Sequence, residues 1–289
     1  MNDYLISILL GIIEGVTEFL PVSSTAHLRI AEALLQLDLK DSFWKMYSVV
    51  IQLGAILSLP VYFRTRIVEF ISTFPKGEQG DRTIFTHPLS LTMAAFVVTA
   101  IPSYLLKKQI GLNLESLTIM GWALIVGGVV MWLVDALFRQ PKIERLEEMK
   151  LLHALWIGAV QILSAVFPGT SRSMSTIAAG QVAGLSRSAA LEFSFFLSIP
   201  TMAVATGYDL YKTLRPETHD AADAALAPVH MNAHAWLVLA IGFAVSFVVA
   251  LAVVAWFMRW VRARGFVPFA IYRIVAGVVL LILVGRGLI

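Results

Sequence analysis

A cluster of carboxylate, hydroxyl and imidazole side chains near the N-terminus could perform acid–base or nucleophilic chemistry. Glu14 and Glu18 are spaced i, i+4, so on a helix both carboxylates project from one face. Carboxylates inside an apolar segment are costly and by default mark a functional site, the alternative being a structural hydrogen bond to a neighbouring helix. The spacing suits either a general base or a shared divalent cation, and it does not choose between them.

A run of hydroxyls follows these carboxylates. Ser23, Ser24 and Thr25 come directly after Pro21-Val22, and His27 lies three residues beyond Ser24. A hydroxyl and an imidazole within one turn are the minimum for an activated nucleophile. Ser-Ser-Thr after Pro is also a common helix N-cap, and such a cap is compatible with phosphate binding because N–H groups at a helix start bind phosphate oxygens.

A second polar turn, Pro168–Ser173, contains an arginine. Arg172 stands among hydroxyls, and Gly169 permits close approach of the backbone. This pattern predicts an anion clamp, with a snorkelling interfacial arginine as the alternative.

The two turns are copies of one motif. Residues 11–29 align without gaps with residues 158–176, 147 positions later, and each copy is an apolar run broken by Pro into a Ser/Thr-rich turn. Such backbone is tolerated in lipid only where it lines a cavity. Two breaks in corresponding halves predict a site at the membrane midplane between internal repeats. The matched positions are Gly11 with Gly158, Glu14 with Gln161, Thr17 with Ser164, Pro21 with Pro168, and Ser24 with Ser171.

Composition places the chain in a membrane. Its 289 residues are 58% hydrophobic and only 14% charged, against roughly 25% charged residues in soluble domains. The net charge of +3 comes from Lys and Arg between apolar runs, so we expect no nucleic-acid partner. The absence of cysteine excludes disulfides, thiol catalysis and Cys-ligated zinc. Glu14 and Glu18 interrupt the first apolar run, so a cleaved signal peptide is not expected.

The apolar runs predict an all-α polytopic membrane protein forming a single membrane domain, 1–289. A helix needs roughly 20 apolar residues to cross the hydrocarbon core, and two further stretches, 4–37 and 152–188, each resemble a re-entrant helical hairpin. Repeat 1 is expected at about 1–106 and repeat 2 at about 150–258, with a linking span and a final span. The six predicted full spans are 46–63, 89–106, 117–138, 191–210, 235–258 and 267–287.

Charge sets the expected orientation. Three loops rich in Lys and Arg, within 64–82, 139–150 and 259–264, are predicted to be cytoplasmic, and the acidic loop around 211–234 external. Six spans satisfy every loop only if each hairpin returns to the side it entered. The first hairpin then enters from outside and the second from inside, which makes an inverted-topology repeat. Arg187 and Arg273 are predicted near the membrane edges, in contact with headgroups.

The two motifs, Glu14-Gly-Val-Thr-Glu18-Phe-Leu-Pro-Val-Ser-Ser-Thr-Ala-His27 and Pro168-Gly-Thr-Ser-Arg-Ser173, closely resemble those of the undecaprenyl-diphosphate phosphatase family, the bacitracin-resistance type. The resemblance covers essentially the whole chain. It implies hydrolysis of the terminal phosphate of undecaprenyl diphosphate, recycling of this carrier for cell-wall synthesis, and dependence on a divalent cation, with Mg²⁺ or Ca²⁺ expected. It further implies a bacterial cytoplasmic (inner) membrane and an active site facing the periplasm or exterior.

Two positions depart from the family pattern. Met174 replaces a usual Gly, and Ser48 replaces a Glu found in many members. Neither is a presumed reacting group. Carried over onto this chain, the resemblance implies that the catalytic residues are Glu18, Ser24, His27 and Arg172. It implies that substrate is bound by Ser23, Thr25, Ser171, Ser173 and Thr176. It implies that the metal is held by Glu14 and Glu18.

In the favoured mechanism Ser24 attacks the terminal phosphorus, and His27 or Glu18 takes its proton. Direct attack by water held by Glu18 is the alternative. The expected partners are a polyprenyl diphosphate lipid and membrane lipids, and homo-oligomer formation is left open. A transporter or flippase of polyprenyl phosphates is the rival hypothesis, because broken helices in inverted repeats are also transporter architecture. A structural scaffold is the weakest hypothesis.

Overall fold

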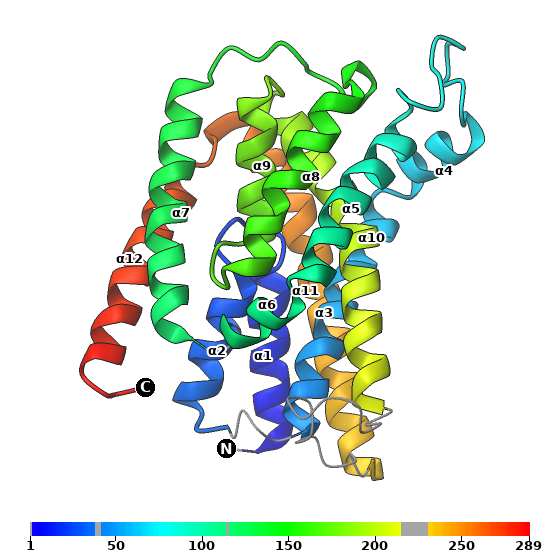
Figure 1. Cartoon of the computed structure of the whole chain (residues 1–289). Helices are drawn as coiled ribbons and strands as arrows, with labels where there is room; N and C mark the ends of the chain where they lie inside the picture. The colour runs from blue at the N-terminus through cyan, green and yellow to red at the C-terminus, as the bar shows by residue number, and fades with distance from the viewer. Residues whose placement is uncertain (1, 38–41, 114–115, 215–230) are drawn as a thin grey trace.

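The computed structural model describes residues 2–37, 42–113, 116–214 and 231–289 (Figure 1). Over these ranges the chain is helical and forms no strand, and its only extended pairing is one bridge between Ile143 and Leu185. A single 3₁₀ turn spans Leu146–Glu148. The α-helices are α1 Asp3–Thr17, α2 Ser24–Leu34, α3 Ser42–Tyr62, α4 Arg64–Ser72, α5 Pro88–Leu105, α6 Lys107–Asn113, α7 Leu117–Leu137, α8 Leu151–Val166, α9 Arg172–Val182, α10 Arg187–Leu214, α11 Ala233–Arg264 and α12 Val267–Gly285.

Six described helices, α3, α5, α7, α10, α11 and α12, are long and apolar enough to cross a membrane. This number confirms the six predicted full spans, and each predicted span overlaps one of these helices. The largest difference at a single end is in α11, which continues to Arg264, beyond the predicted end at residue 258. Element ends of this kind are the least determined by hydropathy.

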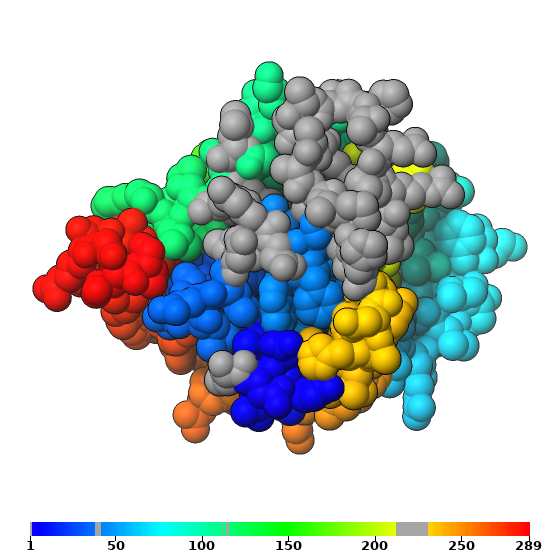
Figure 2. Space-filling model, turned by 90° about the horizontal axis from the view of Figure 1, so that it is seen from below, coloured from blue at the N-terminus to red at the C-terminus, as the bar shows by residue number. Residues whose placement is uncertain are grey.

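Four shorter helices occupy the two predicted hairpin regions. In Figure 1, α1 starts at the lower end of the molecule and α8 at the upper end, and each stops near the middle, where the chain turns into α2 or α9. Figure 2 views the lower end, where the first turn of α1 lies beside the first turn of α11. There His234 bridges Asp3 and Tyr4, with distances of 2.9 Å to each.

The two mid-molecule turns end in the same unusual backbone. Ser23 and Ser171 are the N-caps of α2 and α9, with φ of 75° and 70°, and their hydroxyls accept the N–H groups of Ala26 and Met174. Positive φ is strained for a residue with a Cβ, at a cost of about 1–3 kcal/mol, and such strain collects at functional sites. The caps are 148 positions apart, one more than the ungapped alignment, so Ser24 and Arg172 begin their helices at equivalent positions.

Small residues let the short helices pack closely on the long ones. A Cβ on Gly11 would lie 2.9 Å from the carbonyl oxygen of Gly242 on α11, and a Cβ on Gly158 would collide with the backbone of Ala95 on α5. Close approach through glycine is a common mode of helix association in membranes. α1 is thereby fixed against α11 and α8 against α5, which holds both turns in place.

Candidate active site

Glu18 connects the two turns. Its Oε2 accepts a hydrogen bond from the Ser24 hydroxyl at 2.6 Å, and its Oε1 accepts one from Arg172 Nη2 at 3.1 Å. Glu18 and Ser24 are only 7% and 8% exposed. A carboxylate this close to a hydroxyl can accept its proton, and the arginine offers positive charge where a phosphoryl group would gain negative charge.

Arg172 belongs to the protein interior. It is the first residue of α9, its side chain is 10% exposed, and it also donates to the Ser194 carbonyl on α10 at 3.4 Å. Within the described residues its buried Nε has no hydrogen-bond partner. The side chain therefore does not extend to the membrane surface as a snorkelling arginine would, and one donor is left for an anionic ligand.

His27 lies in the same turn but faces elsewhere. Its Nδ1 is 2.7 Å from the Ser23 carbonyl oxygen, and its Nε2 is 2.6 Å from the Tyr272 hydroxyl. Because a carbonyl oxygen only accepts, Nδ1 carries the proton, and in the neutral ring Nε2 accepts from the Tyr272 hydroxyl. Both ring nitrogens are thus engaged by groups other than Ser24, and the Ser24 hydroxyl contacts the Glu18 carboxylate instead.

The remaining hydroxyls mainly fix the two turns. Ser173 donates to the Leu20 carbonyl at 2.9 Å, which joins the second turn to the first, and its Oγ is 3.0 Å from that of Ser171. Thr176 is 2.7 Å from the Ser194 hydroxyl on α10. Ser23 acts as the N-cap of α2, and Thr25 is half-buried beside it. The predicted substrate-binding hydroxyls therefore gather around Arg172 and Ser24.

Glu14 is a buried carboxylate without a hydrogen-bond partner among the described residues. It is 0% exposed, and neither carboxylate oxygen has a hydrogen-bond partner in the described part of the chain. An unpaired buried carboxylate is costly, so these oxygens call for a proton or a cation. Glu14, Glu18 and Ser24 offer the hard oxygen donors that Mg²⁺ and Ca²⁺ prefer. No group of three or more His, Cys, Asp or Glu that could hold a metal ion lies among the described residues.

Arg273 was not predicted to belong here. It is 0% exposed and donates to four backbone carbonyls: Pro21 at 3.1 Å, Ala123 at 3.1 Å, Gly169 at 3.0 Å and Thr170 at 2.9 Å. The predicted headgroup contact was therefore wrong. The guanidinium ties the first turn to the second because α12 packs against α7, where Gly127 leaves room for it. The available signal was its depth, seven residues into an apolar helix.

Arg187 also differs from its predicted headgroup role. It forms a bidentate ion pair with the buried Asp135 on α7, at 2.7 and 2.9 Å.

The side chains at the two positions that depart from the family pattern make contacts with their neighbours. Ser48 donates to the buried Glu32 on α2 at 2.9 Å, and the Met174 side chain fills space next to Gly127. Glu192 on α10 forms an ion pair with Arg66 at 3.2 Å.

Comparison with known proteins places this arrangement in a family. Residues 7–279 match the model of the family described as bacitracin resistance protein BacA. A protein of Koribacter versatilis named undecaprenyl-diphosphatase is 66% identical over 97% of this chain and 98% of its own length. Proteins of the same name from Novosphingobium aromaticivorans and Caldanaerobacter subterraneus are 41% and 38% identical, each over 97% of this chain and 98% and 96% of their own. The chain therefore belongs to the bacitracin resistance protein BacA family.

Proposed function

We propose that this protein is an integral membrane phosphatase that hydrolyses undecaprenyl diphosphate to undecaprenyl phosphate and inorganic phosphate. The observation that carries this proposal is the buried Ser24–Glu18–Arg172 chain at the junction of the two turns. It combines a nucleophile, a base and an anion donor, in a chain with relatives named undecaprenyl-diphosphatase. The product would return to the lipid-carrier pool of cell-wall synthesis, and bacitracin resistance would follow from removal of the diphosphate.

In the mechanism we favour, the Ser24 hydroxyl attacks the terminal phosphorus and Glu18 accepts its proton. The Oγ–P bond forms as the anhydride P–O bond breaks, and the lipid monophosphate leaves. Arg172 and the N–H groups at the starts of α2 and α9 stabilise the charge on the phosphoryl oxygens. The departing lipid monophosphate takes this proton from Glu18. Glu18 can then deprotonate the water that hydrolyses the phosphoserine to serine and inorganic phosphate. In the alternative, Glu18 activates water directly and Ser24 only binds the phosphate.

Glu14 and Glu18 would hold a divalent cation in this scheme. When bound, the cation would neutralise charge on the diphosphate and draw it toward two carboxylates that would otherwise repel it. Support comes from the two unpaired, buried oxygens of Glu14. Among the described residues the second-repeat counterpart, Gln161, is neutral and its Oε1 is also unpartnered. The cation would therefore be held on the first-repeat side of the site.

We further propose that α1–α2 and α8–α9 are re-entrant hairpins of an inverted-topology repeat. Two observations support this: α1 and α8 start at opposite ends of the molecule, and both turns end in a serine cap with positive φ. Applied to the Lys- and Arg-rich loops, the positive-inside rule then orients α1–α2 toward the exterior of a bacterial cytoplasmic membrane. The active site would open toward that side.

The competing transporter hypothesis explains the anion donors but gives no use for the Ser24–Glu18 hydrogen bond. Purified protein in detergent micelles, where no two sides exist, should release inorganic phosphate from a polyprenyl diphosphate. The corresponding polyprenyl monophosphate should release no inorganic phosphate. Binding of the diphosphate with cation present but without phosphate release would overturn the phosphatase proposal and favour transport.

A further inference from the structure

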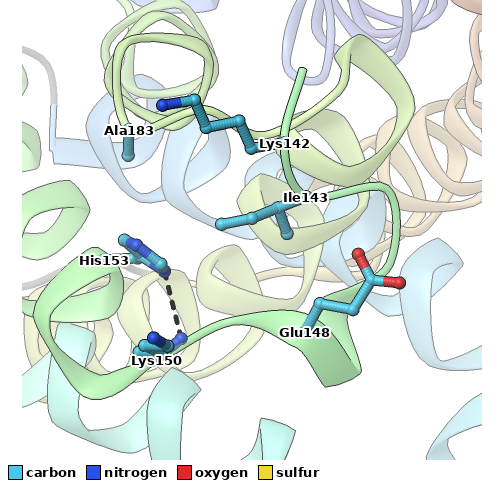
Figure 3. Close-up of a pocket in the computed structure, with 6 residues that line it drawn as sticks. All are labelled: Lys142, Ile143, Glu148, Lys150, His153 and Ala183. Carbon is cyan, nitrogen blue, oxygen red and sulfur yellow. Dashed lines mark hydrogen bonds between the residues drawn. The ribbon is translucent and has the colours of Figure 1, made fainter.

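A hollow lies away from the candidate active site, at the end of the molecule that carries the α7–α8 connection. It measures about 380 Å³ and is bounded by that connection, the start of α8 and the end of α9. α9 separates it from Arg172, and its eleven residues correspond to about 16 Å at 1.5 Å per residue. The residues that line it are Lys142, Ile143, Glu148, Lys150, His153 and Ala183 (Figure 3).

The walls of this hollow are held by backbone hydrogen bonds. The N–H groups of Lys142 and Ile143 donate to the Gly184 carbonyl at 2.8 and 3.0 Å, and the Ser186 N–H donates to the Ile143 carbonyl at 2.8 Å. The α7–α8 connection is therefore attached to the α9–α10 turn. The position of the two segments that bound the hollow is therefore fixed by backbone contacts as well as by side chains.

The lining is chemically suited to an anion. Lys142 and Lys150 have no ion-pair partner in the part of the chain that the structure describes, whose ion pairs involve other residues. His153 Nδ1 accepts the Lys150 N–H at 3.0 Å, so its neutral ring carries a proton on Nε2 and can donate. In Figure 3, Lys142 lies on one side of the hollow and the Lys150–His153 pair on another.

The one acidic side chain of the lining is compensated within its own loop. Glu148 accepts the N–H groups of Glu144 and Arg145 at 2.8 and 3.4 Å, and Arg145 Nε at 3.3 Å. The Glu144 N–H, together with Arg145, lowers the pKa of Glu148 below its ordinary value. The Glu148 carboxylate is therefore hydrogen-bonded to donors of its own loop. The lysines of the lining have no such partner among the described residues.

An apolar stripe begins at the same place. Leu152, Trp156 and Leu163 follow one face of α8 and are 74%, 45% and 49% exposed. Trp156 is anchored by its Nε1, which donates to the Ala179 carbonyl on α9 at 3.1 Å. Basic pockets next to apolar helix surfaces at the membrane interface suit lipid phosphates, because the chains and the headgroup are satisfied together.

We propose that this pocket binds the phosphate group of an anionic phospholipid, whose acyl chains lie along the Leu152–Trp156–Leu163 face of α8. Lys142 and Lys150 supply the charge, and His153 Nε2–H donates a hydrogen bond. Because α8 ends at the second turn of the candidate active site, an occupied pocket stabilises the helix pair that carries Arg172.

The test measures the melting temperature of the purified full chain in detergent micelles. It compares the effects of added phosphatidylglycerol, phosphatidylcholine and inorganic phosphate. Phosphatidylglycerol should raise the melting temperature of the wild type, and phosphatidylcholine should have little effect. For Lys142→Gln/Lys150→Gln, the half-protecting amount of phosphatidylglycerol should rise about tenfold, since each Lys near the surface contributes appreciably. Lys142→Arg/Lys150→Arg should behave like the wild type, and so should Lys76→Gln/Arg259→Gln, which removes the same charge from exposed positions elsewhere.

Each arm of this experiment decides something. Equal protection by phosphatidylglycerol in the wild type and in Lys142→Gln/Lys150→Gln would overturn the proposal, as would equal protection by phosphatidylcholine. Protection by inorganic phosphate that matches the lipid and is lost in the Gln variant would support the phosphate site and identify its source as soluble. Native mass spectrometry, counting lipids retained by each variant, distinguishes lost binding from lost folding.

Discussion

The Ser24 hydroxyl donates to Glu18 across 2.6 Å, while both nitrogens of His27 are engaged by other groups. Glu18→Gln should therefore lower kcat by about 10²–10⁴, the usual contribution of a general base. His27→Gln should lose less, because it breaks a contact with Tyr272 that only positions the turn. Phosphate release from a polyprenyl diphosphate measures both. A larger loss of kcat in His27→Gln than in Glu18→Gln would return the role of base to the histidine.

Arg172 should not be replaceable by lysine. Its guanidinium contacts both Glu18 and the Ser194 carbonyl, and a lysine offers only a point charge without the planar fork. Arg172→Lys is expected to lose at least about tenfold in kcat/KM, whereas Arg259→Lys, at an exposed position, should not change it. Wild-type kcat/KM in Arg172→Lys would show that charge alone is sufficient.

Arg273 should govern stability more than chemistry. Arg273→Lys leaves several of the four carbonyls without a donor, at an expected cost of about 3 kcal/mol in the free energy of unfolding. Gly127→Ala should also lower the free energy of unfolding, because a Cβ at this position would collide with the Arg273 guanidinium. Thermal unfolding in micelles measures both. Wild-type melting temperatures in both variants would contradict the claim that Arg273 stabilises the junction of the two turns.

These residues show how far the sequence could predict the site. The turns were predictable because Pro and hydroxyls interrupt apolar runs, and the spans because each has enough apolar length. The position of Arg273 depends on which face of α12 meets α7, and a single α12 sequence does not determine that packing. The direction of the His27 ring likewise depends on Tyr272, 245 positions away. The one-residue shift between the caps was hidden because the ungapped alignment matched a serine with a serine.

Cation dependence should involve Glu14 specifically. Its oxygens have no described partner, so Glu14→Gln should raise the Mg²⁺ or Ca²⁺ concentration needed for half-maximal activity by about tenfold or more, as expected for a lost charged ligand. Chelation should abolish wild-type phosphate release, and added cation should restore it. Full activity after exhaustive chelation would exclude this role for Glu14.

Orientation can be tested with single cysteines, because the chain contains none. Ala233→Cys at the start of α11 should react with an impermeant thiol reagent in intact cells. Gln140→Cys, between α7 and α8, should react only after lysis. Both positions are exposed. Labelling of both from outside would contradict the opposed orientation of the two hairpins.

The most direct test of the account is to look for phosphate on Ser24. Wild-type protein mixed with a polyprenyl diphosphate and quenched in acid within one turnover should yield a peptide containing Ser24 with one added phosphate. Ser24→Ala should carry no phosphate and should not turn over, whereas Ser23→Ala, which removes only the α2 cap, should keep both the modification and a measurable rate. Unmodified Ser24 throughout turnover, together with near-normal hydrolysis by Ser24→Ala, would contradict the covalent mechanism and support direct attack by water held by Glu18.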